Sequence, residues 1–349
     1  MSMELPIAVD AMGGDYAPDE IISGVADSGV PVILTGPEKV LSQHLKDSEI
    51  PMQYEIVNAE QIVLNDDNPM SALRSKKESS MMTAIRLVKE GRAAGVMSAG
   101  NTGAFMMGAT MMLGRLPNVS HPAAAIPVPN ATGHSLMLDG GAATDSDASD
   151  LVNFAVMGSE YVHHIWGVKN PRIGLLSIGE EEIKGSRSAK EAHQLLKLSG
   201  LNFLGNVQGS DLGTTSVDVI VTDGFTGNVA LKVAEGVATL IMEIVKKEIR
   251  KSSGIEKLAA LALTPMMRRI KKHVDWQEYG GSALLGVKGN VVIAHGKSRK
   301  RAVSSAIKLA YELAKTDLLH RLEESLNKHH MPEEVAEGKD KGNGDSRKK

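Results

Sequence analysis

The sequence has no cysteine, few aromatic residues and no long apolar run, and each absence removes a class of function. Without cysteine, the 349-residue chain has no thiol nucleophile, disulfide framework, cysteine-ligated zinc or iron–sulfur cluster. Aromatic residues are 3% of the chain, which argues against base-stacking platforms for nucleic acid. No apolar segment reaches the roughly 18 residues of a membrane-spanning helix. The first residues show no secretory signal pattern, so we expect a cytoplasmic protein.

The charge balance is nearly even. The chain has 39 lysines and arginines against 42 aspartates and glutamates, which gives a formal net charge of −3. This balance argues against a dedicated nucleic-acid binder, although it allows a local basic patch. Hydrophobic residues are 42% of the chain, as in globular proteins, and the length suits one large α/β domain or two smaller ones.

Short apolar runs alternate with helical patterns such as 18–27, 79–90 and 150–161. This alternation predicts a largely parallel sheet covered by helices. The residues Pro129 and Gly133 lie between two of the runs and predict a hairpin, hence an antiparallel strand in a mixed sheet. The expected strands are 7–11, 30–35, 53–57, 93–98, 123–128, 135–138, 172–178, 201–204, 217–222 and 291–294.

Two segments depart from this alternation. Residues 231–274 are helical in pattern throughout, with interruptions at 252–254 and at Thr264-Pro265, and they predict a helical hairpin that projects from the core. Beyond about residue 326 the chain is charged and almost without apolar residues, which is typical of a disordered tail. We therefore expect a single α/β domain over 1–326, with the hairpin inserted, and a tail over 327–349.

Glycine-rich loops with small polar residues follow six of the expected strands. Glycine lets the backbone approach a ligand closely, and a following helix offers free N–H groups to an anion. One such loop alone would be an ordinary tight turn. Six at equivalent strand ends predict one composite site for a small anion, above all phosphate. The loops are 10–15, 98–103, 139–142, 179 with 184–186, 223–228 and 295–298.

Several other site patterns are missing or incomplete. The chain has neither the dinucleotide fingerprint nor the Gly-x-Ser-x-Gly nucleophile elbow. The segment 296–298 resembles the end of a P-loop, but Val291 stands where a P-loop has glycine. The histidine pairs 163–164 and 329–330 lack carboxylates at metal-ligand spacing, so we expect no metal site. The pairs Met106-Met107 and Met111-Met112 favour core packing, with the lining of a lipid channel as the alternative.

The loops 10–15, 98–103 and 223–228, in this order, resemble the bacterial phosphate acyltransferase (PlsX) family of phospholipid synthesis. The segments 74–81, 279–282 and 294–296 also match, and the resemblance runs from about residue 7 to about residue 322. It implies a mixed, mostly parallel α/β sheet in a three-layer fold like isopropylmalate dehydrogenase and phosphotransacetylase, and a homodimer. One departure is Ala143, because the family has asparagine at the end of this Asp-x-Gly-Ala-Asn loop.

The resemblance also implies a reaction without a cofactor. A long-chain fatty acyl group passes from acyl carrier protein to inorganic phosphate, and the acyl phosphate feeds a membrane glycerol-3-phosphate acyltransferase. Since phosphate is the nucleophile, an enzyme-borne thiol or hydroxyl is not needed. Rival interpretations are a phosphotransacetylase-like enzyme that uses coenzyme A thioesters, a dehydrogenase of the related fold, and a non-catalytic membrane scaffold of phospholipid synthesis.

By the same resemblance, Lys184 and Asn228 fall where the family's most important catalytic lysine and asparagine lie. We expect Lys184 to contact phosphate or the oxyanion, and Asn228 to donate its amide to the oxyanion. The simpler interpretations are a solvated loop lysine and a helix N-cap. We expect Asp10 and Asp15 to orient donors or the pantetheine arm. The predicted substrate- and phosphate-binding residues are Asp10, Gly13, Gly14, Asp15, Ser98, Asn101, Thr102, Gly103, Gly185, Asp223, Thr226, Gly227, His295 and Gly296.

The hairpin carries a local excess of positive charge. Residues 246–272 contain nine lysines and arginines and two acids, around an apolar stretch expected at the hairpin tip. An apolar tip flanked by basic residues suits an anionic membrane surface, and the family is peripheral to the inner face of the cell membrane. A dimer interface and a docking face for acidic acyl carrier protein are the alternatives. The predicted membrane-binding residues are Leu258, Leu261, Leu263, Met266 and Met267.

Overall fold

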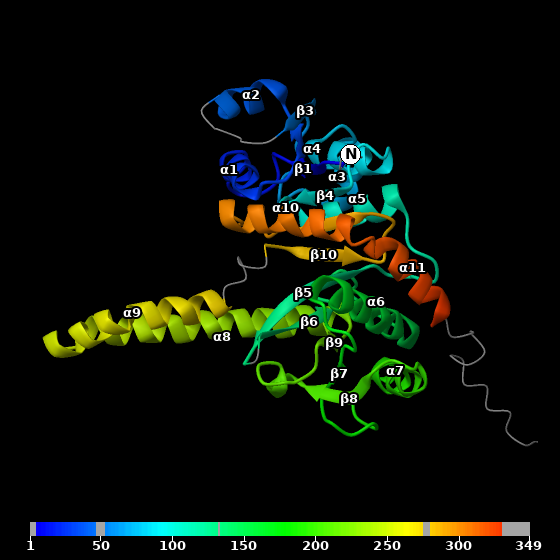
Figure 1. The fold of residues 1–349 in the computed structure, drawn as a ribbon, viewed down its shortest axis with the longest axis vertical. Coiled ribbons are helices and arrows are strands. Elements are labelled where there is room, and N and C mark those ends of the chain that lie inside the picture. The colour runs from blue at the N-terminus through cyan, green and yellow to red at the C-terminus, as the bar shows by residue number, and fades with distance from the viewer. Residues whose placement is uncertain (1–4, 47–52, 132, 275–279, 330–349) are drawn as a thin grey trace, which may run out of the picture.

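The structure, a computed structural model, describes residues 5–46, 53–131, 133–274 and 280–329 (Figure 1). Its eleven described strands form one open mixed sheet in the order β3-β2-β1-β4-β11-β10-β5-β6-β9-β7-β8. The strands are β1 (Ile7–Asp10), β2 (Val32–Gly36), β3 (Tyr54–Asn58), β4 (Gly95–Ser98), β5 (Ala123–Asn130), β6 (Gly133–Leu138), β7 (Ile173–Ser177), β8 (Phe203–Gln208), β9 (Val219–Val221), β10 (Ser282–Leu285) and β11 (Asn290–Ile293).

Helices cover both faces of this sheet. They are α1 (Asp19–Ser28), α2 (Glu38–Lys46), α3 (Pro69–Ser75), α4 (Ser80–Lys89), α5 (Thr102–Leu113), α6 (Ala148–Trp166), α7 (Arg187–Leu198), α8 (Gly224–Lys251), α9 (Gly254–Val274), α10 (Lys300–Lys315) and α11 (Leu318–Lys328), with a 3₁₀ turn at Gly209–Asp211. The predicted mixed, mostly parallel α/β sheet is confirmed. The ten expected strands are present, and β10 is an eleventh that the sequence did not predict.

The direction of the strands changes in the middle of the sheet. The strands β3, β2, β1, β4 and β11 are mutually parallel, and so are β6, β9, β7 and β8. Between these groups, three successive pairings are antiparallel: β11 with β10, β10 with β5, and β5 with β6 in the predicted hairpin. Three reversals leave the two parallel groups running in opposite directions. The expectation that all six glycine-rich loops share one edge is therefore wrong.

The apolar core differs between the two faces of the sheet. Because strand side chains alternate, Ile7 and Val9 of β1 join one core, whereas Ala8 joins another. The first core is continuous from α1 and α10 to α6, α7 and α11. The opposite face carries two separate clusters, one under α4 and α5 and one under α8. The interruption between them is the place where a ligand can reach the sheet.

The predicted hairpin is formed by α8 and α9, which project from the body of the protein (Figure 1). The helix α8 begins at Gly224, earlier than the expected 231, and the turn lies at 252–254 as predicted. The predicted break at Thr264-Pro265 is wrong, because Pro265 lies inside α9. Proline removes one helical hydrogen bond, and in an exposed arm water can solvate the carbonyl that loses its partner.

The structure describes the C-terminal segment of the chain as far as residue 329. The helix α11 extends through Lys328, two residues into the segment expected to be a tail. Residues 330–349 lie outside the described residues, so the rest of that tail stays a prediction.

In the part of the chain that the structure describes, no helix is long and apolar enough to cross a membrane.

Packing of α1 on α10 gives a stability prediction. A Cβ at Gly24 would lie 2.5 Å from Cβ of Val303, so Gly24→Ala forces the two helices apart. We expect it to lower the free energy of unfolding by about 1–3 kcal/mol. Gly236→Ala in exposed α8 is the control, because nothing lies within 4 Å of its Cβ, and it should be neutral or stabilise by up to about 1 kcal/mol. Urea unfolding measures both, and equal effects would contradict the packing.

Candidate active site

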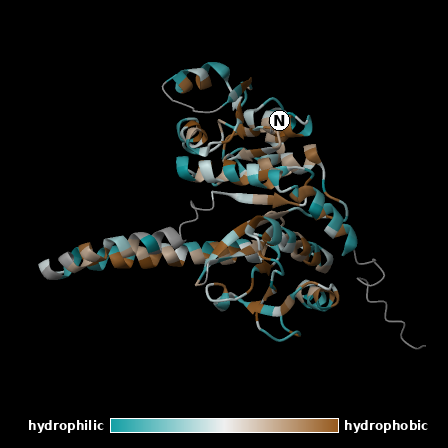
Figure 2. Ribbon diagram, viewed as in Figure 1, coloured by the Kyte–Doolittle hydropathy of each residue, from teal (hydrophilic) through white to brown (hydrophobic). Residues whose placement is uncertain are grey.

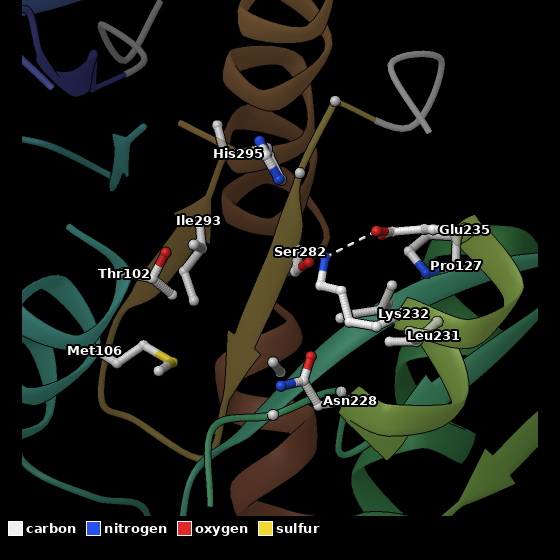
Figure 3. A pocket seen from close by; sticks show the side chains of 17 residues that line it. Thr102, Met106, Pro127, Asn228, Leu231, Lys232, Glu235, Ser282, Ile293 and His295 are labelled. Atoms are coloured by element: carbon white, nitrogen blue, oxygen red, sulfur yellow. Dashed lines mark hydrogen bonds and ion pairs between the residues drawn. The ribbon is translucent and has the colours of Figure 1, made fainter. Parts of the chain in front are cut away.

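A cavity of about 340 Å³ opens where the core is interrupted, between α5 and α8. Its floor comes from β5, β10 and β11. Figure 3 shows Thr102, Met106 and Ile293 on one side and Asn228 and Lys232 on the other. We call this cavity the cleft. The residues that line it are Thr102, Met106, Ala124, Ile126, Pro127, Gly140, Gly141, Asn228, Leu231, Lys232, Glu235, Gly280, Gly281, Ser282, Ile293, Ala294 and His295.

One face of α8 supplies the polar wall of the cleft. Asn228, Lys232 and Glu235 recur at helical spacing, so their side chains share that face. The Lys232 ammonium pairs with Glu235 at 2.8 Å between Nζ and Oε2 (Figure 3). No hydrogen-bond partner for the Asn228 side chain occurs among the described residues, and its amide faces the cavity (Figure 3). The wall thus offers an amide donor beside a positive charge.

The first turn of α8 is capped by Asp223. Its carboxylate accepts hydrogen bonds from the Thr226 backbone N–H at 2.8 Å and from the Thr226 hydroxyl at 2.7 Å. The interpretation of Asn228 as the N-cap is therefore wrong, because Asn228 lies one turn inside the helix. The Asn228 side chain does not cap the helix, so it is available to bind a ligand.

A buried carboxylate holds the loop beneath α8. Asp139 accepts backbone N–H groups from Ala124, Gly141, Ala142 and Ala143 at 2.7–2.9 Å. Burial raises the pKa of Asp139, and these hydrogen bonds oppose that rise. Because the loop is organised by backbone amides, the missing family asparagine at 143 leaves this scaffold intact.

Two glycines let α8 sit directly on that loop. A Cβ at Gly224 would overlap the carbonyl oxygen of Ala143, and a Cβ at Gly227 would overlap that of Asp139. Gly141, with φ of +126°, lies against the side chain of Asn228. Of the predicted residues, Gly227 therefore acts through close packing that fixes the position of Asn228.

The predicted loops after β1 and β4 build a support beside the cleft. The Ser98 hydroxyl donates to Asp10 Oδ2 at 2.6 Å and accepts the Gly100 N–H at 3.1 Å. Burial raises the pKa of Asp10, and hydrogen bonds from Ser80, Ser98 and Met12 oppose the rise. A Cβ at Gly13 would lie 2.5 Å from Asp10 Oδ2, so this glycine is needed for the contact. Asp10 therefore holds the Ser98 hydroxyl in place, and its predicted role toward a substrate stays a prediction.

The loop after β11 is hydrogen-bonded to the loop after β1, and so joins the same supporting group of loops. The Asp15 N–H donates to the Gly296 carbonyl at 2.8 Å, and Asn65 donates to Asp15 Oδ1 at 2.6 Å. Gly14, with φ of +109°, packs on Ala99 and the Gly296 carbonyl. These residues join three loops, and they lie outside the lining of the cleft.

The N-terminus of α5 presents Thr102 to the cleft. The neighbouring Asn101 caps α5 by accepting the Ala104 N–H at 2.9 Å. Its amide also donates to three backbone carbonyls, the shortest at 2.9 Å to Asp67. Gly103 packs against Pro69. Among the predicted residues of this loop, Thr102 is therefore the one that lines the cavity, and Asn101 holds the loop in place.

His295 lines the cleft at the end of β11. Burial, followed by the positive charges of Lys232 and Lys297, lowers its pKa. Its Nδ1 accepts the Lys297 N–H at 3.1 Å, which requires the unprotonated Nδ1. The ring is therefore neutral near pH 7.

The predicted residues Lys184, Gly185 and Thr226 lie on the other side of α8. A second cavity of about 790 Å³ is lined there by Gly185, Asp223 and Thr226. Lys184 is exposed, and its carbonyl accepts the Ser177 hydroxyl at 3.2 Å. It lines neither cavity, so the structure does not bring Lys184 and Asn228 into one cavity.

The sequence interpretation missed Lys232, Glu235 and Leu231. A signal was present, because these residues follow Asn228 at intervals of three, four and seven in an expected helix. Ile126 and Ser282 were missed for another reason. They depend on β5 and β10 lying side by side, which only the sheet order reveals. Among the described residues, no group of three or more histidine and acidic side chains is placed to hold a metal ion.

Comparison with known proteins places this geometry in a family. The family model described as "Fatty acid synthesis protein" matches residues 5–321. A phosphate acyltransferase of Halothermothrix orenii is 43% identical over 92% of this chain and 98% of its own. A phosphate acyltransferase of Campylobacter jejuni is 45% identical over 93% of this chain and 98% of its own.

Solved structures match in fold. A phosphotransacetylase from Streptococcus pyogenes has a TM-score of 0.60 and 17% identity, and covers 91% of this chain and 95% of its own. The phosphotransacetylase EutD from Staphylococcus aureus has a TM-score of 0.60 and 15% identity, and covers 89% and 94%. The expected phosphotransacetylase-like fold is thereby confirmed. The chain belongs to the phosphate acyltransferase (PlsX) family of fatty acid synthesis proteins, and it is an acyltransferase.

Proposed function

We propose that this enzyme transfers a long-chain fatty acyl group from acyl carrier protein to inorganic phosphate, and that the acyl phosphate serves phospholipid synthesis. The observation that carries the proposal is the two-sided cleft. One wall bears the amide of Asn228 and the charge of Lys232, and the other bears apolar Met106 and Ile293. The naming of the relatives as phosphate acyltransferases supports phosphate as acceptor.

The reaction needs positioning more than an enzyme-borne nucleophile. A phosphate oxygen attacks the thioester carbonyl carbon, a C–O bond forms, and the C–S bond breaks. The sulfur leaves as a thiolate and takes up the proton that phosphate gives up, so free carrier and acyl phosphate result. Holding both reactants in one cleft replaces an unfavourable bimolecular encounter.

The residues of the cleft match the charges that develop. The Asn228 amide donates to the oxyanion that forms on the carbonyl oxygen. Lys232 offsets the repulsion between the phosphate anion and the oxyanion that develops on the carbonyl oxygen, and Glu235 fixes its position at 2.8 Å. Thr102 begins α5, whose first N–H groups lack acceptors within the helix and favour an anion.

The role of Lys184 in this proposal rests on the family resemblance. Its exposed side chain makes no hydrogen bond or ion pair within the described part of the chain, so its charge is available to an anionic substrate that enters beside α8. The loops around Asp10, Asp15 and Gly296 act by supporting the wall of the cleft.

The hairpin supports a proposed homodimer. On α8, Val237, Leu240, Ile241 and Ile244 are about half exposed and repeat at helical spacing. We call these four residues the α8 stripe, and Figure 2 shows hydrophobic residues along the projecting helices. An apolar seam of this kind is buried in helical bundles when another helix packs on it. A second copy of the chain, with its own stripe, is the proposed partner.

The helix α9 supports a proposed membrane contact. Leu261, Leu263 and Met266 are 68%, 50% and 40% exposed. The sequence interpretation put them at the tip, and this is wrong: the far end is the polar turn 252–254, and they lie along the flank of α9. The side chain of Leu258 lies outside the described set, and Met267 is half-buried.

Basic residues near the turn complete this membrane surface. Lys246, Lys247, Arg250 and Lys251 occupy the last turns of α8. Apolar side chains beside basic ones suit an anionic bilayer surface. We therefore place the enzyme at the inner face of the cell membrane, where a membrane-bound glycerol-3-phosphate acyltransferase consumes its product.

A transacylation assay tests the proposed reaction. Palmitoyl-acyl carrier protein is incubated with the enzyme, with and without inorganic phosphate, and acyl phosphate is trapped with hydroxylamine. We expect release of free carrier that depends on phosphate. A parallel series with palmitoyl- and acetyl-coenzyme A decides the donor. If the enzyme turns over a coenzyme A thioester but not palmitoyl-acyl carrier protein, the proposed acyl donor is wrong. If none of these thioesters is turned over, the proposed reaction is wrong.

Removal of the oxyanion donor should affect turnover more than binding. We expect Asn228→Ala to lower kcat about 100- to 1,000-fold with little change in the Michaelis constant for phosphate. We expect Lys184→Ala, measured beside it, to lower kcat/KM at least about 100-fold, and a wild-type value would contradict the role of Lys184. A wild-type kcat in Asn228→Ala would remove Asn228 from the oxyanion site.

The phosphate contact has a matched control on the same helix. Lys232→Met should raise the Michaelis constant for phosphate at least about tenfold, because the cleft loses a charge-assisted contact. Lys246 forms the same kind of ion pair, with Glu243 at 2.9 Å, but lies away from the cleft. Lys246→Met should leave phosphate kinetics unchanged in detergent-free solution, and equal effects of both variants would contradict the assignment.

Mutations distinguish the two proposed surfaces of the hairpin, the α8 stripe for the dimer and the apolar side chains of α9 for the membrane. The double variant Leu240→Asp with Ile244→Asp should convert a dimer to monomers in light scattering. Leu261→Asp should leave the dimer intact and weaken co-sedimentation with anionic phospholipid vesicles. A dimer that survives the stripe variant, or vesicle binding unaffected by Leu261→Asp, would contradict the corresponding surface.

A further inference from the structure

The loop that carries Lys184 is anchored by one asparagine of β8. We call residues 179–184 the lysine loop. The Asn206 side-chain amide donates to the Glu181 carbonyl at 2.9 Å and to the Gly179 carbonyl at 3.2 Å. The Lys184 backbone N–H donates to the same Glu181 carbonyl, at 2.9 Å. The stem of Lys184 lies over Gly179, since a Cβ at that glycine would lie 3.1 Å from Lys184 Cγ. Asn206 therefore holds both backbone groups on which the lysine rests.

The other contacts of the lysine loop are weaker. Glu182 pairs with Lys197 at 2.6 Å between Oε1 and Nζ, but both side chains are about half exposed, and exposed ion pairs contribute little. The Ser177 hydroxyl donates to the Lys184 carbonyl at 3.2 Å, which is long for such a bond. The position of the lysine thus depends mainly on Asn206.

The composition of the lysine loop explains why it needs an anchor. It begins with a glycine and is followed by Gly185, with φ of +111°, so the backbone at its ends has wide conformational freedom. Three adjacent glutamates, 180–182, repel one another. Without hydrogen bonds to the body of the protein, these features favour an open loop.

A buried histidine orients Asn206. His193 of α7 is 3% exposed, and its Nδ1 lies 2.8 Å from Asn206 Oδ1. Because the nitrogen of the Asn206 amide donates to the loop, its oxygen is the acceptor here, and His193 Nδ1 carries the proton. The His193 ring packs edge-on against Phe203, with ring centroids 5.1 Å apart. This buried bond holds Asn206 in the rotamer that reaches the lysine loop.

The lysine loop borders the second cavity. Ile178 and Gly185, which flank the loop in the sequence, both line that cavity. The loop therefore lies beside the space next to α8 at which the proposed function brings an anionic substrate to Lys184. Asn206 and His193 line neither cavity, so they can act on a substrate only through the loop.

We infer that Asn206, oriented by His193, is a positioning residue that fixes the lysine loop and so presents the Lys184 ammonium to substrate. The inference rests on the proposed function, in which Lys184 contacts the anionic substrate. A loop that is fixed in advance needs no ordering when substrate binds, whereas a loop that is open part of the time lowers the fraction of competent enzyme.

A double-mutant cycle with Lys184 tests the inference. Asn206→Leu should lower kcat/KM for palmitoyl-acyl carrier protein about tenfold or more, because the loop loses two hydrogen bonds. In a Lys184→Ala background the same change should cost less than about twofold, since no ammonium remains to be positioned. A merely structural role of Asn206 would add to the loss of the lysine, so additive effects would overturn the inference.

Variants of His193 test the orientation of Asn206. His193→Phe keeps an aromatic ring but loses the donor, and it should lower kcat/KM about fivefold or more. His193→Asn places an amide N–H near the position of Nδ1 and should restore kcat/KM to within about threefold of the wild type. Equal values for the two variants would contradict the orienting role of His193.

Asn202→Leu is the matched control for Asn206→Leu. The Asn202 amide also donates to a backbone carbonyl, that of Asn170 at 3.1 Å, but Asn170 precedes β7 whereas the lysine loop follows it. This substitution should change kcat/KM less than about twofold. A loss equal to that of Asn206→Leu would overturn the specific role of Asn206.

Release of the lysine loop is measured without turnover by limited proteolysis. A glutamyl endopeptidase cuts after glutamate, and the loop contains three at 180–182. Asn206→Leu should raise the rate of cleavage there about fivefold or more, because local opening exposes the backbone to the protease. Asn202→Leu should cleave at the wild-type rate. An unchanged rate in Asn206→Leu would show that Asn206 does not hold the loop and would overturn the inference.

The outcomes distinguish this inference from the proposed function. A wild-type kcat/KM in Lys184→Ala would remove the lysine from the proposed reaction, and the positioning role of Asn206 with it. If Lys184→Ala is impaired while Asn206→Leu has the wild-type kcat/KM, the positioning role alone is wrong.

Discussion

The shape of the cleft depends on the backbone hydrogen bonds that stabilise one buried carboxylate, that of Asp139. Asp139 is fully buried, and burying a charge without partners is costly. Four backbone N–H groups surround it and fix the 139–143 loop in a single shape. Gly224 and Gly227 then allow α8 to lie directly on that loop. The position of Asn228, and of the lysine one turn further, follows from this contact.

The centre of the sheet explains why the cleft exists at all. Three antiparallel pairings reverse the strand direction between the two parallel groups, so the helices that cover one face come from two different halves. On that face α5 and α8 approach from opposite sides and leave part of β5, β10 and β11 open to the cleft. The other face has no such gap, because its core is continuous. The cleft therefore opens on one face of the sheet.

The sequence predicts the strands and loops well, and the contacts across the chain poorly. Buried β strands such as Ile7–Asp10 are continuous apolar runs, so their pattern is local. The strand Ser282–Leu285 was missed because glycines precede it and no helix separates it from β11. Asn228 was identified by its motif, whereas Lys232 joined the site only through the geometry of α8. Lys184 and Asn228 follow the parallel strands β7 and β9, so the separation of Lys184 from the cleft depends on the position of α8 between the two cavities, which residue spacing does not encode.

We propose that phosphate binds in the cleft at Lys232, beside the oxyanion donor Asn228. The most direct test is a crystal structure of the protein with tungstate, an electron-dense oxyanion that stands in for phosphate, located by anomalous scattering. We expect a tungstate peak in the cleft within hydrogen-bond distance of the Lys232 ammonium. A cleft without tungstate, at concentrations of the anion that inhibit turnover competitively with phosphate, would contradict it.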